Sequence, residues 1–235
     1  MDRLVNVLAE WNIDVTDEQL SKFSLYYEML IEWNEKMNLT SITDKEEVIY
    51  KHFLDSSALI KYCDISGKKI LDVGTGAGFP GIVLKILNPE CSVTLLDSLA
   101  KRITFLNEVI TQLQLDNIVA IHGRAEDYAN NKLYREKYDI VTSRAVANLS
   151  TLSEYCIPFT KVNGYFIPYK SGNIDEEIDN AKRALHLLGG SFEKVEKFTL
   201  PNTEFDRSLL FIKKVKGTPR QYPRKAGTPS KNPLS

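Results

Sequence analysis

The spacing of apolar residues changes near residue 69 and divides the chain into two parts. Before this point, apolar side chains recur every three or four residues, which predicts amphipathic helices opened by two capping boxes, Thr16-Asp-Glu-Gln19 and Thr43-Asp-Lys-Glu46. After it, short apolar runs of strand length alternate with helical patterns. We therefore expect two or three helices ahead of an α/β domain.

Seven segments of the second part have the length and composition of β-strands. They are 69–73, 92–97, 118–122, 138–143, 164–170, 194–200 and 208–215, and helices are expected over 81–87, 99–115, 149–159 and 174–188. Strands that alternate with helices form parallel sheets covered on both faces. We expect a seven-stranded, mostly parallel sheet in which the last two strands form a closing antiparallel pair.

The stretch from Lys69 to Gly81, K-I-L-D-V-G-T-G-A-G-F-P-G, joins the first strand to a helix. Gly74, Gly76 and Gly78 carry no Cβ, so a ligand can approach the backbone closely where the chain turns. The proline that follows suits the first turn of a helix, where its missing N–H costs little. A strand, a glycine-rich loop and a helix N-terminus in this order predict a site for a polar or anionic ligand.

Asp97 ends the second strand about 20 residues beyond the glycines, where a ribose-binding carboxylate is expected. Enzymes that bind NAD and enzymes that bind S-adenosylmethionine (SAM) both use such a carboxylate. The order D-x-G-x-G-x-G over residues 72–78 resembles class I methyltransferases, although a G-x-G-x-x-G pattern also fits NAD enzymes. We expect a Rossmann-like, SAM-dependent methyltransferase fold. NAD-linked reduction is the alternative, and no convincing proton donor for hydride transfer is found.

The composition is ordinary for a globular protein, with 43% hydrophobic and 26% charged residues among 235. No apolar run approaches the roughly 20 residues that cross a bilayer, and the first residues do not resemble a signal peptide, so we expect a cytoplasmic protein. Cys63, Cys91 and Cys156 are far apart and form no C-x-x-C motif. Neither a disulfide framework nor a metal site is expected.

Basic charge is concentrated at the C-terminal end. Residues 213–235 contain seven Lys or Arg residues and no acid, whereas the first 212 residues contain 23 basic and 31 acidic side chains. Such a segment suits an RNA phosphate backbone, although most basic ends are simply solvated. Charge alone therefore leaves the choice between RNA binding and a solvated tail open.

His52, Asp55 and Ser56 supply the groups of a hydrolase triad, but consecutive turns of one helix cannot arrange them as a relay. A structural role, or a place at the edge of a pocket, is expected instead. Because their helix precedes the glycine-rich loop by so few residues, His52 or Asp55 is a candidate to face the ligand.

Ligands of open α/β sheets bind beyond the carboxyl ends of the strands. Four ends are available, and we expect them to form one cleft: Gly74 to Phe79, Asp97 to Leu99, Ala125 with Glu126, and Ser143 with Arg144. In this cleft Ala125 and Glu126 would flank an adenine and Arg144 would face the substrate. A surface salt bridge is the alternative for Glu126 and Arg144.

The sequence also limits which atom of the substrate can accept the methyl group. Amino groups of adenine or cytosine are commonly methylated by enzymes with an N-P-P-Y-like loop after the fourth strand, where this chain has Ser143-Arg-Ala-Val146. Carbon methylation of pyrimidines needs a nucleophilic cysteine, and no cysteine lies at a suitable strand end. Guanine N7 has a free lone pair and no proton to lose, so its methylation requires chiefly alignment and favourable electrostatics.

Several segments of the chain resemble the RsmG family, historically called glucose-inhibited division protein B. They are residues 32–42, His52-Phe-Leu-Asp-Ser56, Asp72 to Gly81, Ser143-Arg-Ala-Val-Ala147 and Tyr222-Pro-Arg-Lys-Ala-Gly-Thr-Pro-Ser-Lys-Asn-Pro-Leu234. The resemblance implies a SAM-dependent methyltransferase that acts on N7 of one guanine in the decoding-region loop of bacterial 16S ribosomal RNA, guanine 527 in the usual rRNA numbering.

Residue roles follow from this resemblance by matching position. SAM binding is assigned to Gly74, Gly76, Gly78, Phe79, Asp97, Ser98, Leu99, Ala125, Glu126 and Arg144, and RNA backbone contacts to Arg220, Arg224, Lys225 and Lys231. No catalytic residue is assigned, although Arg144 is suited to orient the methionine carboxylate or an RNA phosphate. Ile167-Pro-Tyr-Lys170 departs from the family pattern, which leaves a substrate role for Lys170 open.

We expect three parts: a helical extension over 1–66, a SAM-binding domain over 67–216 and a basic tail over 217–235. The expected partner is 16S rRNA or the small ribosomal subunit. The helical stripes of the extension are expected to pack on the sheet domain of a monomer. An RNA- or ribosome-binding protein whose SAM is structural or regulatory is the alternative from another class.

Overall fold

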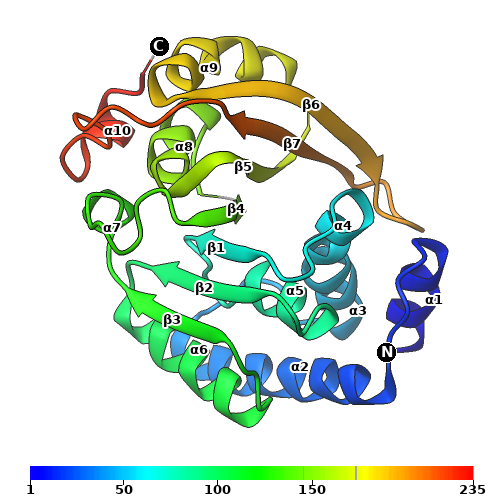
Figure 1. Cartoon of the computed structure of the whole chain (residues 1–235). Helices are drawn as coiled ribbons and strands as arrows, with labels where there is room; N and C mark the ends of the chain where they lie inside the picture. The colour runs from blue at the N-terminus through cyan, green and yellow to red at the C-terminus, as the bar shows by residue number, and fades with distance from the viewer. Residues whose placement is uncertain (145, 173, 235) are drawn as a thin grey trace.

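One twisted sheet of seven strands forms the centre of the molecule in the computed structural model, which describes residues 1–144, 146–172 and 174–234. The strands are β1 Lys69–Val73, β2 Ser92–Asp97, β3 Ile118–His122, β4 Tyr138–Arg144, β5 Thr160–Ser171, β6 Gly190–Thr199 and β7 Asp206–Lys214. Their spatial order is β3-β2-β1-β4-β5-β7-β6 (Figure 1). β1 to β5 pair in parallel, and β7 is antiparallel to both β5 and β6. The predicted sheet and its antiparallel closing pair are confirmed.

Helices cover both faces of this sheet. They are α1 Asp2–Glu10, α2 Asp17–Met37, α3 Lys45–Val48, α4 Asp55–Tyr62, α5 Gly81–Leu87, α6 Ala100–Gln112, α7 Ala125–Tyr128, α8 Leu149–Cys156, α9 Asp175–Leu188 and α10 Thr228–Lys231, with a π-helical turn η1 Ile49–Leu54 and a 3-10 turn η2 Ile157–Phe159. The sequence predicted a helical extension over 1–66 without bounds for α1, whose Leu4, Val7 and Leu8 are buried at helical spacing.

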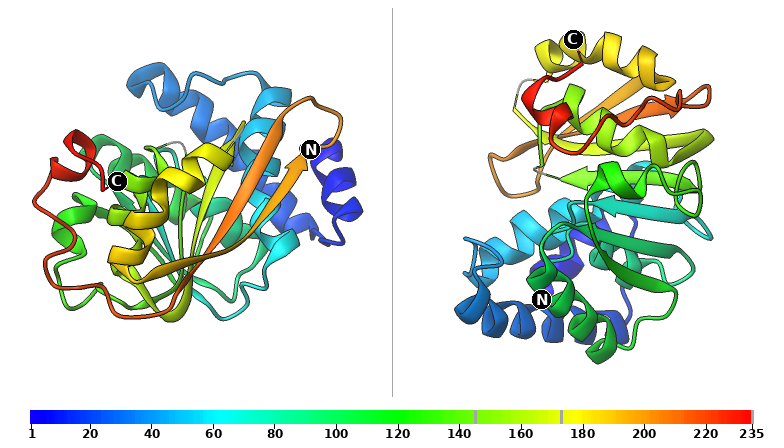
Figure 2. Two further views of the ribbon diagram at one scale, coloured as in Figure 1. Left: turned by 90° about the horizontal axis from the view of Figure 1, so that it is seen from above. Right: turned by 90° about the vertical axis from the view of Figure 1, so that its left-hand side faces the viewer.

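Alternate side chains of each strand enter two separate hydrophobic cores, as the pleat of a strand requires. In β1, Ile70 belongs to the core shared with α1, α2, α4, α5 and α6, whereas Leu71 belongs to the core shared with α8 and α9. In β7, Leu209 and Leu210 divide in the same way. Figures 1 and 2 show the two groups of helices separated by the sheet.

The apolar stripes of the N-terminal helices face the sheet. Phe23, Tyr26 and Leu30 of α2 are fully buried, and Tyr26 donates a hydrogen bond to the Ala77 carbonyl oxygen in the glycine-rich loop. Gln19 also donates to the Ile86 carbonyl at the end of α5 (2.8 Å). The extension therefore shares one core with the sheet domain, and α2 contacts the glycine-rich loop through Tyr26.

The predicted second helix contains a wider turn, η1, where the sequence pattern indicated a continuous α-helix. The Asp55 N–H donates to the Tyr50 carbonyl, five residues back, instead of to Lys51 four residues back. Turns of this kind are frequent at functional sites because they change the direction of side chains and carbonyl groups. In this protein the turn presents the Lys51 carbonyl, His52 and Asp55 toward the end of β4.

The C-terminal segment after β7 is packed on the protein surface, where the sequence predicted a basic tail (Figure 2). Tyr222 and Pro229 are buried, and the Thr151 hydroxyl of α8 donates to the Pro229 carbonyl (3.1 Å). Arg135 donates to the carbonyls of Thr218 and Tyr222. These contacts bring α10 beside α8, close to the carboxyl ends of the parallel strands.

Candidate functional site

Asp72, at the end of β1, holds the glycine-rich loop in shape. Its side chain is fully buried, and Oδ2 accepts hydrogen bonds from the Thr75 hydroxyl (2.7 Å) and the Gly81 N–H (2.9 Å). Burial raises the pKa of Asp72 to about 6 in spite of these donors. The first acid of the D-x-G-x-G-x-G motif is therefore an internal brace that does not reach the cavities described below.

The three predicted glycines have different surroundings. A Cβ on Gly76 would meet no atom within 4 Å, so this side of the loop is open. A Cβ on Gly78 would meet Ile82 at 2.5 Å and Tyr26 at 2.7 Å, so Gly78 permits packing against helices. At Gly74 the obstacle is the Val146 side chain, which faces the loop from beyond β4. Gly76 is thus the position where a ligand can lie directly on the backbone.

Asp97, at the end of β2, is almost completely buried beside this opening. Its carboxylate accepts hydrogen bonds from the backbone N–H groups of Gly76 and Leu99, both at 2.9 Å, and from Arg102 at 3.1 Å. The two backbone bonds fix the carboxylate at the mouth of the loop. Arg102, about one-third exposed, covers its outer side and was not anticipated from the sequence.

Two adjoining cavities lie over the carboxyl ends of the parallel strands and share Gly74, Asp97, Ser98 and Val146. The first, about 400 Å³, is lined by Leu39, Thr40, His52, Gly74, Thr75, Gly76, Ala77, Phe79, Asp97, Ser98, Arg102, Arg144 and Val146. The second, about 350 Å³, is lined by Val73, Gly74, Leu96, Asp97, Ser98, Leu99, Gly123, Arg124, Ala125, Glu126, Val146, Tyr155, Gly227 and Ser230. Nine of the ten predicted cofactor residues lie on these walls, and Gly78 is the exception.

Some lining residues come from segments that the sequence argument did not place at the site. Thr40 follows α2, Tyr155 lies on α8, and Gly227 and Ser230 lie in the C-terminal segment. Glu126, expected beside an adenine, accepts a hydrogen bond from the Gly227 N–H (2.9 Å), so it also fixes the C-terminal segment over the second cavity. The Glu126–Gly227 bond joins residues 101 positions apart, a contact that leaves no local pattern in the sequence.

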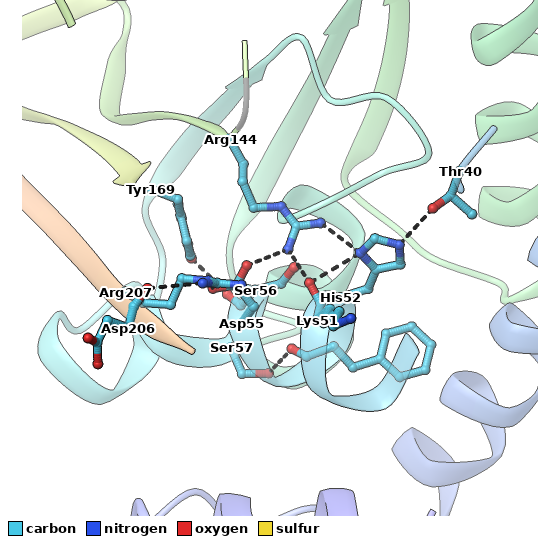
Figure 3. Close-up of polar contacts among 11 residues, drawn as sticks. Thr40, Lys51, His52, Asp55, Ser56, Ser57, Arg144, Tyr169, Asp206 and Arg207 are labelled. Carbon is cyan, nitrogen blue, oxygen red and sulfur yellow. Dashed lines mark hydrogen bonds and ion pairs between the residues drawn. The ribbon is translucent and has the colours of Figure 1, made fainter. Parts of the chain in front are cut away.

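Arg144 lines both the first cavity and a third one, and Figure 3 shows its polar contacts. Its guanidinium donates to the Asp55 carboxylate (2.9 Å), the Lys51 carbonyl (3.0 Å) and His52 Nδ1 (3.3 Å). It also lies 5.2 Å from the centre of the Phe79 ring. The sequence reading left His52 and Asp55 as candidates to face the ligand, and both line cavities here. Ala145, the next residue of that motif, lies outside the described residues.

His52 is held as a neutral imidazole. Its ring stacks on Phe79 with centroids 4.5 Å apart, and its Nε2 is 2.9 Å from the Thr40 hydroxyl. Nδ1 faces Arg144 (3.3 Å), which can only donate, and the Lys51 carbonyl (3.2 Å), which can only accept, so either neutral tautomer has a partner at Nδ1. Burial, and next the charge of Arg144, lower the pKa of His52 to about 3. No hydrogen bond between His52 and Asp55 is found in the described part of the chain, so the triad interpretation has no geometric support.

The third cavity, about 460 Å³, opens on the far side of Arg144. It is lined by Ile42, Lys51, His52, Asp55, Arg144, Tyr169, Lys170, Ser171, Glu177 and Arg207. Four of these side chains are cationic and two are anionic, so with His52 neutral the walls carry a charge of about +2. Arg207 donates to the second oxygen of Asp55 (3.1 Å), and Lys170 donates to Glu177 (2.6 Å).

The basic residues of the C-terminal segment divide into two groups. Arg220, Lys225 and Lys231 are exposed, as RNA contacts must be. Arg224 instead binds Glu154 through Nε and Nη2, at 3.0 and 2.7 Å, and Glu154 is fully buried. A buried carboxylate must be paired, so we revise Arg224 from an RNA contact to an anchor of the segment.

Among the described residues, no helix is long and apolar enough to cross a membrane, and no cluster of His, Cys, Asp and Glu is arranged to hold a metal ion.

Solved structures resemble the fold at low sequence identity. M. jannaschii TYW2 in complex with AdoMet gives a TM-score of 0.57 at 14% identity, with 74% of this chain and 80% of that chain covered. A SAM-dependent methyltransferase from Aquifex aeolicus gives 0.53 at 17% identity, with 72% and 93% covered. At this identity the likeness shows the fold, which is that of class I methyltransferases.

Sequence relatives are similar over nearly the whole chain. The protein described as ribosomal RNA small subunit methyltransferase G of Lachnoclostridium phytofermentans is 56% identical over 228 residues, with 97% of this chain and 94% of that protein covered. The protein of the same description from Bacillus subtilis is 49% identical over 235 residues, with 100% and 98% covered. The model of the family described as GidB, rRNA small subunit methyltransferase G, matches residues 19–209. The chain therefore belongs to the rRNA small subunit methyltransferase G family.

Proposed function

We propose that this SAM-dependent rRNA methyltransferase transfers its methyl group to N7 of one guanine in the decoding-region loop of 16S ribosomal RNA. The choice of N7 rests on the groups around Arg144, where the first of the two cofactor cavities meets the third, cationic cavity. Bound SAM supplies a methyl group on a positively charged sulfonium. The chain's own side chains must then align the acceptor nitrogen with that methyl group.

The first two cavities fit SAM. The open side of Gly76 leaves room where the amino-acid portion would lie on the loop, and Asp97 is fixed at the place of a ribose-binding carboxylate. Ala125 and Glu126 lie on the wall of the second cavity, which suits the adenine. We propose that Gly74, Gly76, Phe79, Asp97, Ser98, Leu99, Ala125, Glu126 and Arg144 form the binding surface, with Gly78 acting through packing.

The groups at the junction favour an acceptor with no proton to lose. Both oxygens of Asp55 are bound by arginines, and His52, with its pKa near 3, has little affinity for a proton at neutral pH. The remaining ionisable groups around the third cavity are cations, the ion-paired Glu177, and Tyr169, whose hydroxyl donates to the Ser56 carbonyl and whose pKa is raised by burial. An amino group or a hydroxyl would require a base, whereas guanine N7 does not.

RNA phosphates are the partners we propose for the exposed basic residues of the C-terminal segment. Arg220, Lys225 and Lys231 lie on the segment that borders the second cavity. Contacts of this kind fix the position of the RNA without reading its sequence. We further propose that the protein acts as a monomer in the cytoplasm, where bacterial ribosomes are assembled. The inward packing of the N-terminal stripes supports the monomer.

The proposal is tested by measuring the transfer of labelled methyl from SAM to protein-free 16S rRNA, to small ribosomal subunits lacking the modification, and to 23S rRNA. We expect labelling of 16S rRNA or of the subunit, and none of 23S rRNA. SAM binding without transfer to either 16S form would favour an RNA-binding protein in which SAM is structural or regulatory.

A further inference from the structure

We propose that the cationic cavity beyond Arg144 is the pocket for the target guanine base, and that Glu177 is the residue that distinguishes guanine from other bases. This inference rests on the proposed function, because it concerns the acceptor of the same methyl group. The cavity shares Arg144 and His52 with the cofactor cleft, so an edge of a base bound in it faces the methyl donor.

The size and charge of the cavity suit a nucleotide. Its volume, about 460 Å³, lies within the range of small-molecule sites, and its net positive walls match a base with its attached phosphates. A base flipped out of an RNA loop is commonly read through hydrogen bonds to its edges. The polar groups of the cavity are therefore the candidates for recognition.

Guanine shows two different edges to such a pocket. N7 and O6 are acceptors on one edge, whereas N1–H and N2–H2 are donors on the other. If N7 faces the cofactor cleft, the neighbouring O6 lies toward Arg144, which can only donate. Adenine has an amino group in place of O6, so two hydrogen-bond donors, this amino group and the guanidinium, would face each other. The donor edge then points away from the junction, toward Lys170 and Glu177.

Only one carboxylate of the cavity has an oxygen left for these donors. Both oxygens of Asp55 are bound, one to Arg144 and the other to Arg207. Glu177 is bound through Oε1 alone, to Lys170 (2.6 Å) and to the Leu149 N–H. Its Oε2 has no hydrogen-bond partner among the residues that the structure describes. Lys170 and the Leu149 N–H hold the carboxylate in place, so we assign Oε2 as the acceptor for the N2 amino group.

The ion pair with Glu177 also explains Lys170, whose role the sequence left open. Lys170 donates to the Ala147 carbonyl (2.8 Å) as well as to Glu177, and its side chain is largely buried. It therefore acts as a positioning residue for Glu177. A direct contact to RNA is not needed to explain it.

The test compares substrates that differ by one amino group. A 16S rRNA fragment is prepared with guanosine or with inosine at the target position, since inosine keeps N7, O6 and N1–H but lacks N2–H2. For the wild type we expect kcat/KM to fall about 10- to 100-fold with inosine, as is usual for a lost hydrogen bond to a charged group. An inosine substrate as good as guanosine would overturn the assignment without any variant.

Glu177→Gln tests the residue itself, because it replaces Oε2 by an amide donor and keeps the shape. We expect its kcat/KM on guanosine to fall at least about tenfold and its ratio of guanosine to inosine to fall to near one. Glu176→Gln is the matched control, since Glu176 is exposed and lines no part of this cavity. Unchanged SAM affinity and an unfolding midpoint like that of the control would show that the change lies in recognition.

If Glu177 had only a structural role, Glu177→Gln would lower kcat/KM equally for the guanosine and inosine substrates. An unchanged ratio of the two kcat/KM values therefore overturns this proposal. The proposed function stays intact in that case if the wild type still forms 7-methylguanine. Failure of the wild type to methylate any guanine would overturn both.

Discussion

His52 shows how one side chain can line a site without taking part in proton transfer. It stacks on Phe79, shares a hydrogen bond with Thr40 and contacts Arg144 and the Lys51 carbonyl, and its pKa is lowered to about 3. Between about pH 3 and 6.5 the unfolded chain binds a proton at this position that the folded protein does not bind. Folding stability therefore decreases as the pH falls through this window.

We expect His52→Gln to remove part of this pH dependence. The wild type should lose up to about 1.4 kcal/mol per pH unit more than the variant between pH 6.5 and 5, because only the wild-type unfolded state gains the proton. Urea unfolding at several pH values measures the difference. Parallel curves for the two proteins would mean that His52 titrates normally in the folded state.

Gly76 and Gly67 form a matched pair for testing the cofactor cleft. Both have positive φ angles, +62° and +66°, and a Cβ on either would meet no atom within 4 Å. Substitution by alanine should therefore strain the backbone similarly at the two positions and lower the free energy of unfolding by about 1–2 kcal/mol in each case. Only Gly76 lies on the cavity wall, so only Gly76→Ala should weaken SAM binding, on the order of tenfold or more by calorimetry. Equal SAM affinities in the two variants would remove Gly76 from the site.

At the scale of elements, the π-helical turn and the C-terminal segment complete a site that the sheet only begins. The wider turn η1 directs the Lys51 carbonyl and Asp55 to Arg144 at the end of β4. The C-terminal segment closes the second cavity through the Gly227 bond to Glu126. Neither feature belongs to the common α/β framework, and both depend on contacts between distant parts of the chain.

The anchoring of the C-terminal segment is tested by separating Arg224 from its exposed neighbours. Arg224→Ala leaves the buried Glu154 carboxylate unpaired, so we expect about 3 kcal/mol of lost stability in thermal or urea unfolding. Arg220→Ala and Lys225→Ala should leave stability unchanged and reduce the salt dependence of RNA binding by about one ion each. If Arg224→Ala left the stability unchanged and reduced only the salt dependence of RNA binding, the assignment of Arg224 as an anchor would be wrong.

The sequence predicted the regular elements well because their signals are local. The periodicity of apolar residues placed β2 and β3 at their observed bounds, and the glycine-rich loop with Asp97 located the cleft. Other features depend on tertiary contacts that leave no local pattern. They include the turn at η1, the pairing of Arg224 with Glu154 and the approach of Thr40 to His52. The bounds of α1 were not predicted either, although Leu4, Val7 and Leu8 have helical spacing.

At the scale of the whole molecule, the helical extension and the sheet share a hydrophobic core and should unfold together. Leu8 of α1 is fully buried in the same cluster as Ile70 of β1 and Leu209 of β7. The two tryptophans, Trp11 and Trp33, report on the extension, whereas far-ultraviolet circular dichroism reports on all elements.

We expect Leu8→Ala to lower the stability by about 2–5 kcal/mol and to move both signals together. Separate transitions for tryptophan fluorescence and circular dichroism would instead identify residues 1–66 as an independent unit.

In the proposed function, the protein as a whole holds one guanine with its N7 toward the methyl donor at the opening beside Arg144. The most direct test is to treat 16S rRNA, methylated in vitro by the purified protein, with sodium borohydride and aniline, which break the strand at 7-methylguanine. We expect a single cut in the decoding-region loop, absent without SAM or protein. Methyl incorporation without any cut would contradict the choice of N7, and a cut elsewhere would contradict the choice of guanine.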